Sequence, residues 1–275
     1  MTDAALESVL RRDRAIVAAA LVIVTALAWA YVLWLAADMA IGGMEMTGFR
    51  MIPAGIGLMA PARAPWQPIE FAFVFAMWAV MMLGMMMPSA TPMILLYARV
   101  GRQAAIAGKP FAATGWFAAG YLLIWAGFAL TATTAQWALE RFALLTPMLE
   151  SVSGLFGGVV LIAAGLYQWT PLKDVCLRQC QAPWLFIQRH GGFRRDAAGS
   201  LALGMRHGCY CVGCCWVLMA LLFVGGVMNV LWIAAIAIFV LAEKVIPAGR
   251  LISRIAGVGF VAAGVWLLVF SPAMT

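Results

Sequence analysis

Seven apolar stretches of 17 to 29 residues, separated by more polar segments, dominate the sequence. They cover residues 16–37, 69–97, 111–137, 152–169, 208–226, 229–247 and 255–271. A helix needs about 20 apolar residues to cross a bilayer, and a crossing helix satisfies its own backbone hydrogen bonds. The sequence therefore predicts an all-α fold, a polytopic transmembrane helix bundle of about seven spans. We expect residues 1–275 to form a single integral membrane domain.

The composition supports this class and argues against others. The chain is 65% hydrophobic and 11% charged, whereas soluble domains are about half apolar and about a quarter charged. The apolar stretch 16–37 is too long for a signal-peptide core and has no clear cleavage site after it, so it is interpreted as the first span. No Gly-rich phosphate-binding loop, serine-nucleophile elbow or pair of carboxylates is evident, and the sequence does not indicate an enzyme.

The Lys and Arg residues predict which side of the membrane each loop faces. With a cytoplasmic N-terminus, 15 of the 18 basic residues fall on the cytoplasmic side, and only Arg50, Arg63 and Arg141 fall on the other. Cytoplasmic loops of membrane proteins carry such an excess. The net charge of +7 is therefore attributed to these loops and not to a nucleic-acid partner. The same bias makes 38–68 an outer loop and 170–206 an inner loop.

A cysteine-rich segment begins the fifth stretch, where residues 207–216 read HGCYCVGCCW. On a helix, His207, Cys211 and either Cys214 or Cys215 share one face, because they are spaced i, i+4 and i+7 or i+8. Thiolates and imidazoles bind soft and borderline metal ions in trigonal or tetrahedral sites. The spacing therefore predicts a metal or redox site at the cytoplasmic end of this span.

The sequence gives less direct indications of where the other three cysteines lie. Cys209 points elsewhere on a regular helix and joins the other ligands only if the helix begins late, at Gly208. Cys176 and Cys180 would share a helical face and form a second thiol site on the same side of the membrane. All six cysteines then lie on the reducing cytoplasmic side, where stable disulfides are rare.

Methionines form a second group of soft donors, with six of them between positions 77 and 87. Met77, Met81 and Met85 recur at i, i+4 and i+8. Thioethers can bind Cu(I) without bringing net charge into the bilayer, but methionine is also an adaptable packing residue, so both interpretations stay open. Pro88 and Pro92 predict a bent or broken helix with freed carbonyls.

Glu243 and Lys244 lie near the inner end of the sixth stretch. Lys244 can extend to the interface by snorkelling, which is harder for Glu243. An ionisable group at membrane depth is a candidate for function. Glu243 could pair with Lys244 or Arg206 or balance a bound cation, so a structural and a functional role are both open.

Four motifs carry a family resemblance: residues 81–89 (MMLGMMMPS), 176–180 (CLRQC), 210–216 (YCVGCCW) and 243–247 (EKVIP). Together they resemble a bacterial family of predicted metal-binding integral membrane proteins, a domain of unknown function sometimes labelled copper chaperone. The likeness runs from about the second stretch to the sixth. It implies metal binding and a location in the bacterial inner membrane, and it implies no established reaction.

Three functions are compatible with these features. The favoured one is binding of a soft metal, most simply Cu(I), in transport, delivery or insertion, with Met44 and Met46 collecting the ion and a metallochaperone or metalloenzyme as partner. The second is a membrane thiol oxidoreductase that uses Cys211 and Cys214. The third is a structural or assembly subunit whose fold is stabilised by a bound zinc or copper ion. Transport direction and oligomeric state are left open.

The predicted ligands are His207, Cys209, Cys211, Cys214, Cys215, Met77, Met81, Met85, Cys176 and Cys180, with Glu243 as a further candidate site residue.

Overall fold

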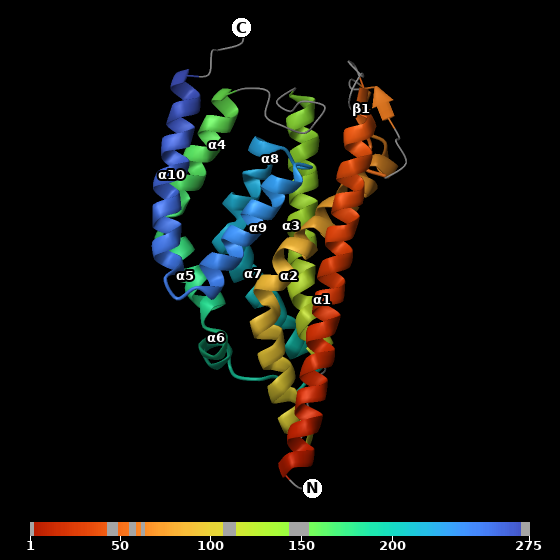
Figure 1. The fold of residues 1–275 in the computed structure, drawn as a ribbon, viewed down its shortest axis with the longest axis vertical. Helices are drawn as coiled ribbons and strands as arrows, with labels where there is room; N and C mark the ends of the chain where they lie inside the picture. Colours follow the sequence, from red (N-terminus) through yellow and green to blue (C-terminus); the bar gives the residue numbers. More distant parts are fainter. Residues whose placement is uncertain are drawn as a thin grey trace.

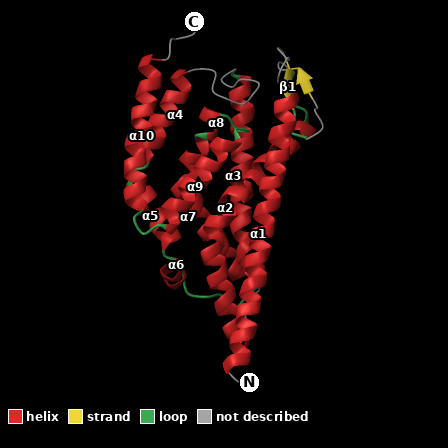
Figure 2. Ribbon diagram, in the orientation of Figure 1, coloured by secondary structure: helices red, strands yellow, loops and turns green. Residues whose placement is uncertain are grey.

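The computed structural model describes residues 3–42, 49–54, 59–61, 64–106, 114–142 and 154–270, and nearly all of them are helical (Figure 2). The helices are α1 (Asp3–Gly42), α2 (Pro68–Ile106), α3 (Thr114–Arg141), α4 (Gly154–Tyr167), α5 (Pro171–Gln181), α6 (Pro183–Arg189), α7 (Ala197–Ala220), α8 (Leu222–Gly225), α9 (Val230–Val245) and α10 (Gly249–Phe270). The strands β1 (Phe49–Met51) and β2 (Met59–Pro61) form a short antiparallel pair. The predicted helical class is confirmed, with this small pair of strands as an addition.

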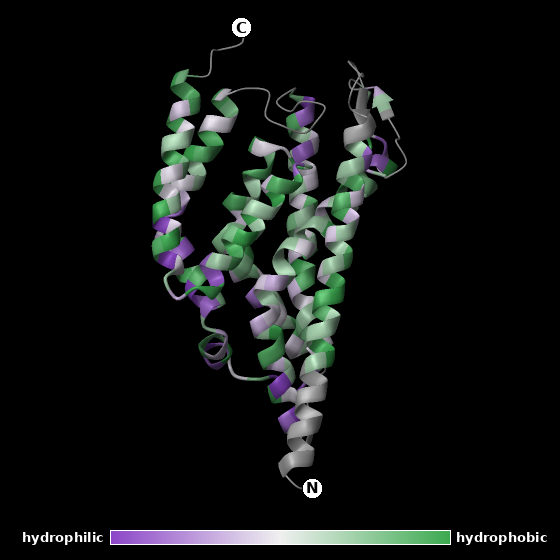
Figure 3. Cartoon of the chain, viewed as in Figure 1, coloured by the Kyte–Doolittle hydropathy of each residue, from purple (hydrophilic) through white to green (hydrophobic). Residues whose placement is uncertain are grey.

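The long helices lie side by side in a bundle, and α1 begins at the opposite end from the one where α10 finishes (Figure 1). Five helical segments, in α1, α2, α3, α7 with α8, and α10, are long and apolar enough to cross a membrane. Helices α4 and α5, bent by 65° relative to each other, make a sixth if they are taken as one span. The most hydrophilic residues lie toward the ends of the helices (Figure 3).

The seven predicted spans are therefore not all confirmed among the described residues. The stretch predicted at 229–247 is α9, whose 16 residues fall short of the roughly 20 needed to cross. The stretch predicted at 152–169 contains α4, whose 14 residues reach a spanning length only together with α5. The cytoplasmic placement of the N-terminus stays a prediction.

Much of the predicted inner loop 170–206 is helical, because local capping groups begin new helices there. The Thr170 hydroxyl accepts a hydrogen bond from the Lys173 N–H at 3.3 Å, and a proline follows Thr170 at the first position of α5. Asp196 caps α7 by accepting from the Gly199 N–H at 2.6 Å. Helix α7 consequently begins 11 residues before the predicted start at 208.

Pro88 and Pro92 lie inside α2, which continues through both, so of the predicted bend or break the break does not occur. Pro88 has no N–H, and the Gly84 carbonyl four residues earlier therefore loses its partner within the helix. The Trp29 indole on α1 donates to this carbonyl at 3.2 Å. The freed carbonyl that the sequence predicts is thus satisfied by a neighbouring helix, as membrane-buried backbone requires.

Glycines bring α7 very close to α3. A Cβ atom at Gly204 would collide with the backbone carbonyl oxygen of Phe117, and one at Gly120 would collide with that of Leu201. Small residues at helix contacts permit this approach of two backbones. The contact places the α3 side chain of Tyr121 against the cysteine-bearing part of α7.

We expect Gly204→Ala to lower the thermal stability of the protein, because the added methyl group has no space and overpacking costs about 1–3 kcal/mol. Gly127→Ala on α3 is the matched control, since no atom lies within 4 Å of its added Cβ. Thermal unfolding in detergent, followed by tryptophan fluorescence, measures both variants. Equal midpoints for the two would contradict the close packing of α3 and α7.

Candidate metal centre

Three thiols converge on one face of α7. Cys211, Cys214 and Cys215 are 2%, 1% and 0% exposed. The thiols of Cys214 and Cys215 donate to the Cys211 carbonyl oxygen at 3.0 and 2.9 Å. The triangle expected from the spacing is therefore formed, and it faces the interior of the bundle.

Helix α5 adds a fourth thiol to this group. The Cys180 side chain lies near this group and interacts electrostatically with the Cys211 and Cys214 thiols. Cys176, one turn earlier on α5, is 6% exposed and packs on α7 at Gly213, where an added Cβ would lie 2.8 Å from its sulfur. The structure thus brings the two predicted thiol groups together, and we call Cys180, Cys211, Cys214 and Cys215 the thiol cluster.

Cys209 does not belong to the thiol cluster. Helix α7 runs unbroken through Gly208, so the late helix start that would turn Cys209 inward does not occur. Successive residues are about 100° apart around a helix, and Cys209 consequently lies on another face and is exposed. The expectation that it joins the other ligands of α7 is corrected.

Lys244 lies beside the thiol cluster and does not snorkel to the interface. Its Nζ is 2.9 Å from the Cys211 Sγ and 3.1 Å from the Ser89 Oγ, and the residue is only 6% exposed. A buried charge must be compensated by partners, and this thiol and hydroxyl supply them. The sequence-based expectation for Lys244 is therefore wrong, and α9 delivers a positive charge to the sulfur atoms.

Glu243 pairs with Lys173 on α5, which was not among the partners considered from the sequence. Both carboxylate oxygens lie 2.9 Å from the Lys173 Nζ, and the two side chains are 1% and 0% exposed. Ser253 donates to the same carboxylate at 2.6 Å, and Gln181 donates to the Glu243 backbone carbonyl at 2.7 Å. This network ties α5 to α9 and thereby holds Cys180 near Lys244.

His207 borders the thiol cluster, one helical turn before Cys211, and is 3% exposed. Its ring centroid lies 5.2 Å from that of Phe186 and 5.7 Å from that of Tyr121. Among the described residues, its Nδ1 is buried with no hydrogen-bond partner. Most buried polar atoms do have a partner, so this imidazole nitrogen is free to bind a ligand.

Tyr121, on α3, contacts both α2 and the thiol cluster. Its hydroxyl lies 3.1 Å from the Cys211 Sγ and donates to the Met86 carbonyl at 3.2 Å. Tyr121, Ser89 and Lys173 were not predicted as site residues. Each contributes from a helix other than α7, and residue spacing within one helix gives no signal for such contacts.

The predicted methionine row is buried in α2, with Met77, Met81 and Met85 at 1%, 1% and 2% exposure. At a rise of 1.5 Å per residue, Met85 lies about 6 Å and Met77 about 18 Å along the helix from Ser89. The row therefore leads away from Lys244 toward the beginning of α2. Met44 and Met46 lie outside the described residues.

A soft metal ion fits the kinds of donor present, although they are not yet arranged around it. Within the part of the chain that the structure describes, no three His, Cys, Asp or Glu side chains already surround a common point as ligands do. The thiols of Cys214 and Cys215 donate to the Cys211 carbonyl oxygen instead. Metal binding would replace the thiol protons.

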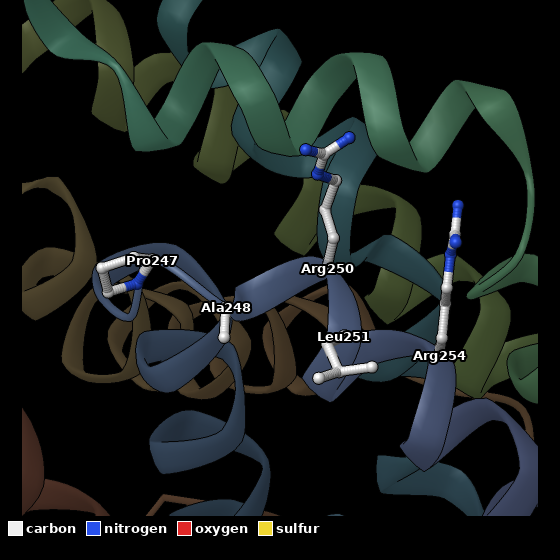
Figure 4. Close-up of a pocket in the computed structure, with 5 residues that line it drawn as sticks. All are labelled: Pro247, Ala248, Arg250, Leu251 and Arg254. Carbon is white, nitrogen blue, oxygen red and sulfur yellow. The ribbon is translucent and has the colours of Figure 1, made fainter.

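A separate cavity of about 350 Å³ lies at the start of α10 and has different chemistry (Figure 4). It is lined by Pro247, Ala248, Arg250, Leu251 and Arg254. The Arg254 guanidinium lies 3.5 Å from the Asp174 carboxylate. Guanidinium groups are donors only, and this cavity therefore does not contribute metal ligands.

A comparison with protein families agrees with this set of donors. The family model PpoB2, described as "Copper chaperone", matches residues 75–267, which include every described member of the centre. Neither a curated protein nor a solved structure matches the chain. Because the matched segment covers well over half of the sequence, the chain belongs to the PpoB2 copper chaperone family.

Proposed function

We propose that the chain binds Cu(I) as its cargo at the thiol cluster and hands it on to a partner protein. The observation that carries the proposal is the burial of three thiols and an imidazole along α7, with the Cys180 thiol of α5 beside them, inside an apolar bundle. Sulfur and imidazole donors select soft ions such as Cu(I). The family description, copper chaperone, points to the same ion.

Lys244 supports a monovalent cargo through charge balance. Cu(I) held by two thiolates carries a net charge of −1, which the ammonium 2.9 Å from the Cys211 Sγ would neutralise. Buried net charge is costly, by several kcal/mol or more. Zn²⁺ on the same two thiolates would form a neutral group and would leave the charge of the ammonium uncompensated. The arrangement thus favours Cu(I) over zinc for a two-thiolate site.

The methionine row offers a neutral path to this site. Met77, Met81 and Met85 follow one buried face of α2, which reaches Lys244 through Ser89. Thioethers bind Cu(I) weakly and without charge, which suits transit, whereas thiolates suit capture. We propose that the ion moves along this row and reaches thiols on the cytoplasmic side of a bacterial inner membrane. A metallochaperone or metalloenzyme would then be the partner.

We expect the double variant Cys211→Ser with Cys214→Ser to lose most tight Cu(I) binding, because it removes two of four converging thiols. Binding is measured anaerobically by competition with a chromogenic Cu(I) chelator. Cys209→Ser is the matched control, since this thiol is exposed on another face of the same helix, and it should keep the tight site. Unchanged binding in the double variant would remove the thiol cluster from the proposal, and a reversible disulfide without copper binding would favour thiol oxidoreduction.

We expect Lys244→Leu to weaken Cu(I) binding by about tenfold or more, equivalent to about 1.4 kcal/mol, because the copper–thiolate group would then carry an uncompensated charge. Lys244→Arg keeps the positive charge and should retain most of the affinity. The same chelator competition measures both variants, and thermal unfolding checks that both are folded. Equal affinity of the folded Leu variant and the wild type would contradict the charge-balance argument.

A further inference from the structure

We propose that a second, exposed Cu(I) site lies in a cavity between α3, α6 and α7, formed by the Cys209 thiol, the His190 imidazole and the Met205 thioether. The cavity has a volume of about 540 Å³, and all three side chains line it. The inference rests on the proposed function, and it names the place where Cu(I) is exchanged with a partner.

The hydrogen bonding of His190 leaves one ring nitrogen ready to bind a metal. Its Nδ1 lies 2.7 Å from the Phe186 carbonyl oxygen. A carbonyl only accepts, so the neutral ring carries its proton on Nδ1 and keeps a lone pair on Nε2. Metal-binding histidines commonly donate their other N–H to a backbone carbonyl in this way. The neighbour of Nε2, the Tyr210 hydroxyl, is 3.5 Å away, at the long limit of a hydrogen bond.

Two soft sulfur donors share the cavity with His190. Met205 and Cys209 are spaced i, i+4 on α7 and therefore lie on one face of it. Cys209 is exposed, and Met205 is 37% exposed. One thiolate, one thioether and one imidazole suit Cu(I), which commonly binds two or three soft ligands. Arg206 also lines the cavity, and its positive charge disfavours divalent ions.

Cu(I) bound at the buried thiol cluster needs a more accessible site from which it can pass to a partner protein. Cu(I) passes between proteins by exchange of ligands, and a partner's ligand cannot reach Cys214 or Cys215 at 1% and 0% exposure. The ring of Phe186 links the two places, because its centroid lies 4.4 Å from that of His190 and 5.2 Å from that of His207. A single aromatic side chain thus separates the half-buried imidazole of His190 from the buried one of His207.

Protection of Cys209 from alkylation tests the site. The purified protein is treated with a maleimide, with and without Cu(I) supplied anaerobically, and modification at Cys209 is followed by peptide mass spectrometry. Cu(I) should slow the reaction in the wild type. His190→Ala should raise the Cu(I) concentration needed for protection by about tenfold or more, since loss of even an outer partner of a ligand costs about 10- to 100-fold. Tyr210→Phe, which removes only a hydroxyl, is the control and should keep protection.

Equal protection in the wild type and His190→Ala would mean that Cu(I) binds the lone thiol adventitiously, and it would overturn the inference. Absence of protection in the wild type would overturn it as well. Equal alkylation rates without copper show that the variants are folded alike. Chelator competition on the Cys209→Ser variant, which lacks the second site, reports the thiol cluster separately. Tight binding without Cys209 protection refutes this site alone, and protection of Cys209 without tight binding refutes the proposed function alone.

Discussion

A positive charge buried among sulfur atoms is the constraint on which the arrangement of the interior depends. An unpaired ammonium inside a protein costs several kcal/mol, and Lys244 meets this cost with a thiol at 2.9 Å and a hydroxyl at 3.1 Å. The preceding residue, Glu243, carries the opposite charge and is paired with Lys173. Helix α9 therefore presents two adjacent charges to different helices, and it cannot rotate or slide without leaving one of them uncompensated.

The same constraint explains why α5 and α7 meet where they do. The ion pair between Lys173 and Glu243 holds α5 against α9, and Lys244 holds α9 against α7. Cys180 therefore lies beside the thiols of α7. The glycines of α3 and α7 complete the group by bringing Tyr121 within 3.1 Å of Cys211. The donors of the proposed copper site are thus assembled by charge pairing and close backbone packing.

Features set within a single helix were predictable from the sequence. The triangle of Cys211, Cys214 and Cys215 follows from helical periodicity, and so does the burial of the methionine row on one face of α2. The carbonyl freed by Pro88 was expected, although not the tryptophan that satisfies it. Hydropathy also identified the long spans, but α9, with 16 residues, is not confirmed as one, because apolar composition does not by itself set the length of a helix.

Features set between helices were not predictable. Lys173 was counted as a loop charge, and Lys244 was expected at the interface. In both cases the outcome depends on which neighbouring helix supplies a partner, and local spacing does not encode this. The contact between the Cys180 thiol and α7 is of the same kind, since it joins two segments that the sequence treats separately.

X-ray absorption at the copper edge of the purified protein, loaded with one equivalent of Cu(I), tests the central claim most directly. The account predicts Cu(I) in a low-coordinate site dominated by sulfur, with a spectrum that changes when Cys211 and Cys214 are replaced. A site dominated by nitrogen or oxygen, or a spectrum indifferent to these cysteines, would contradict it.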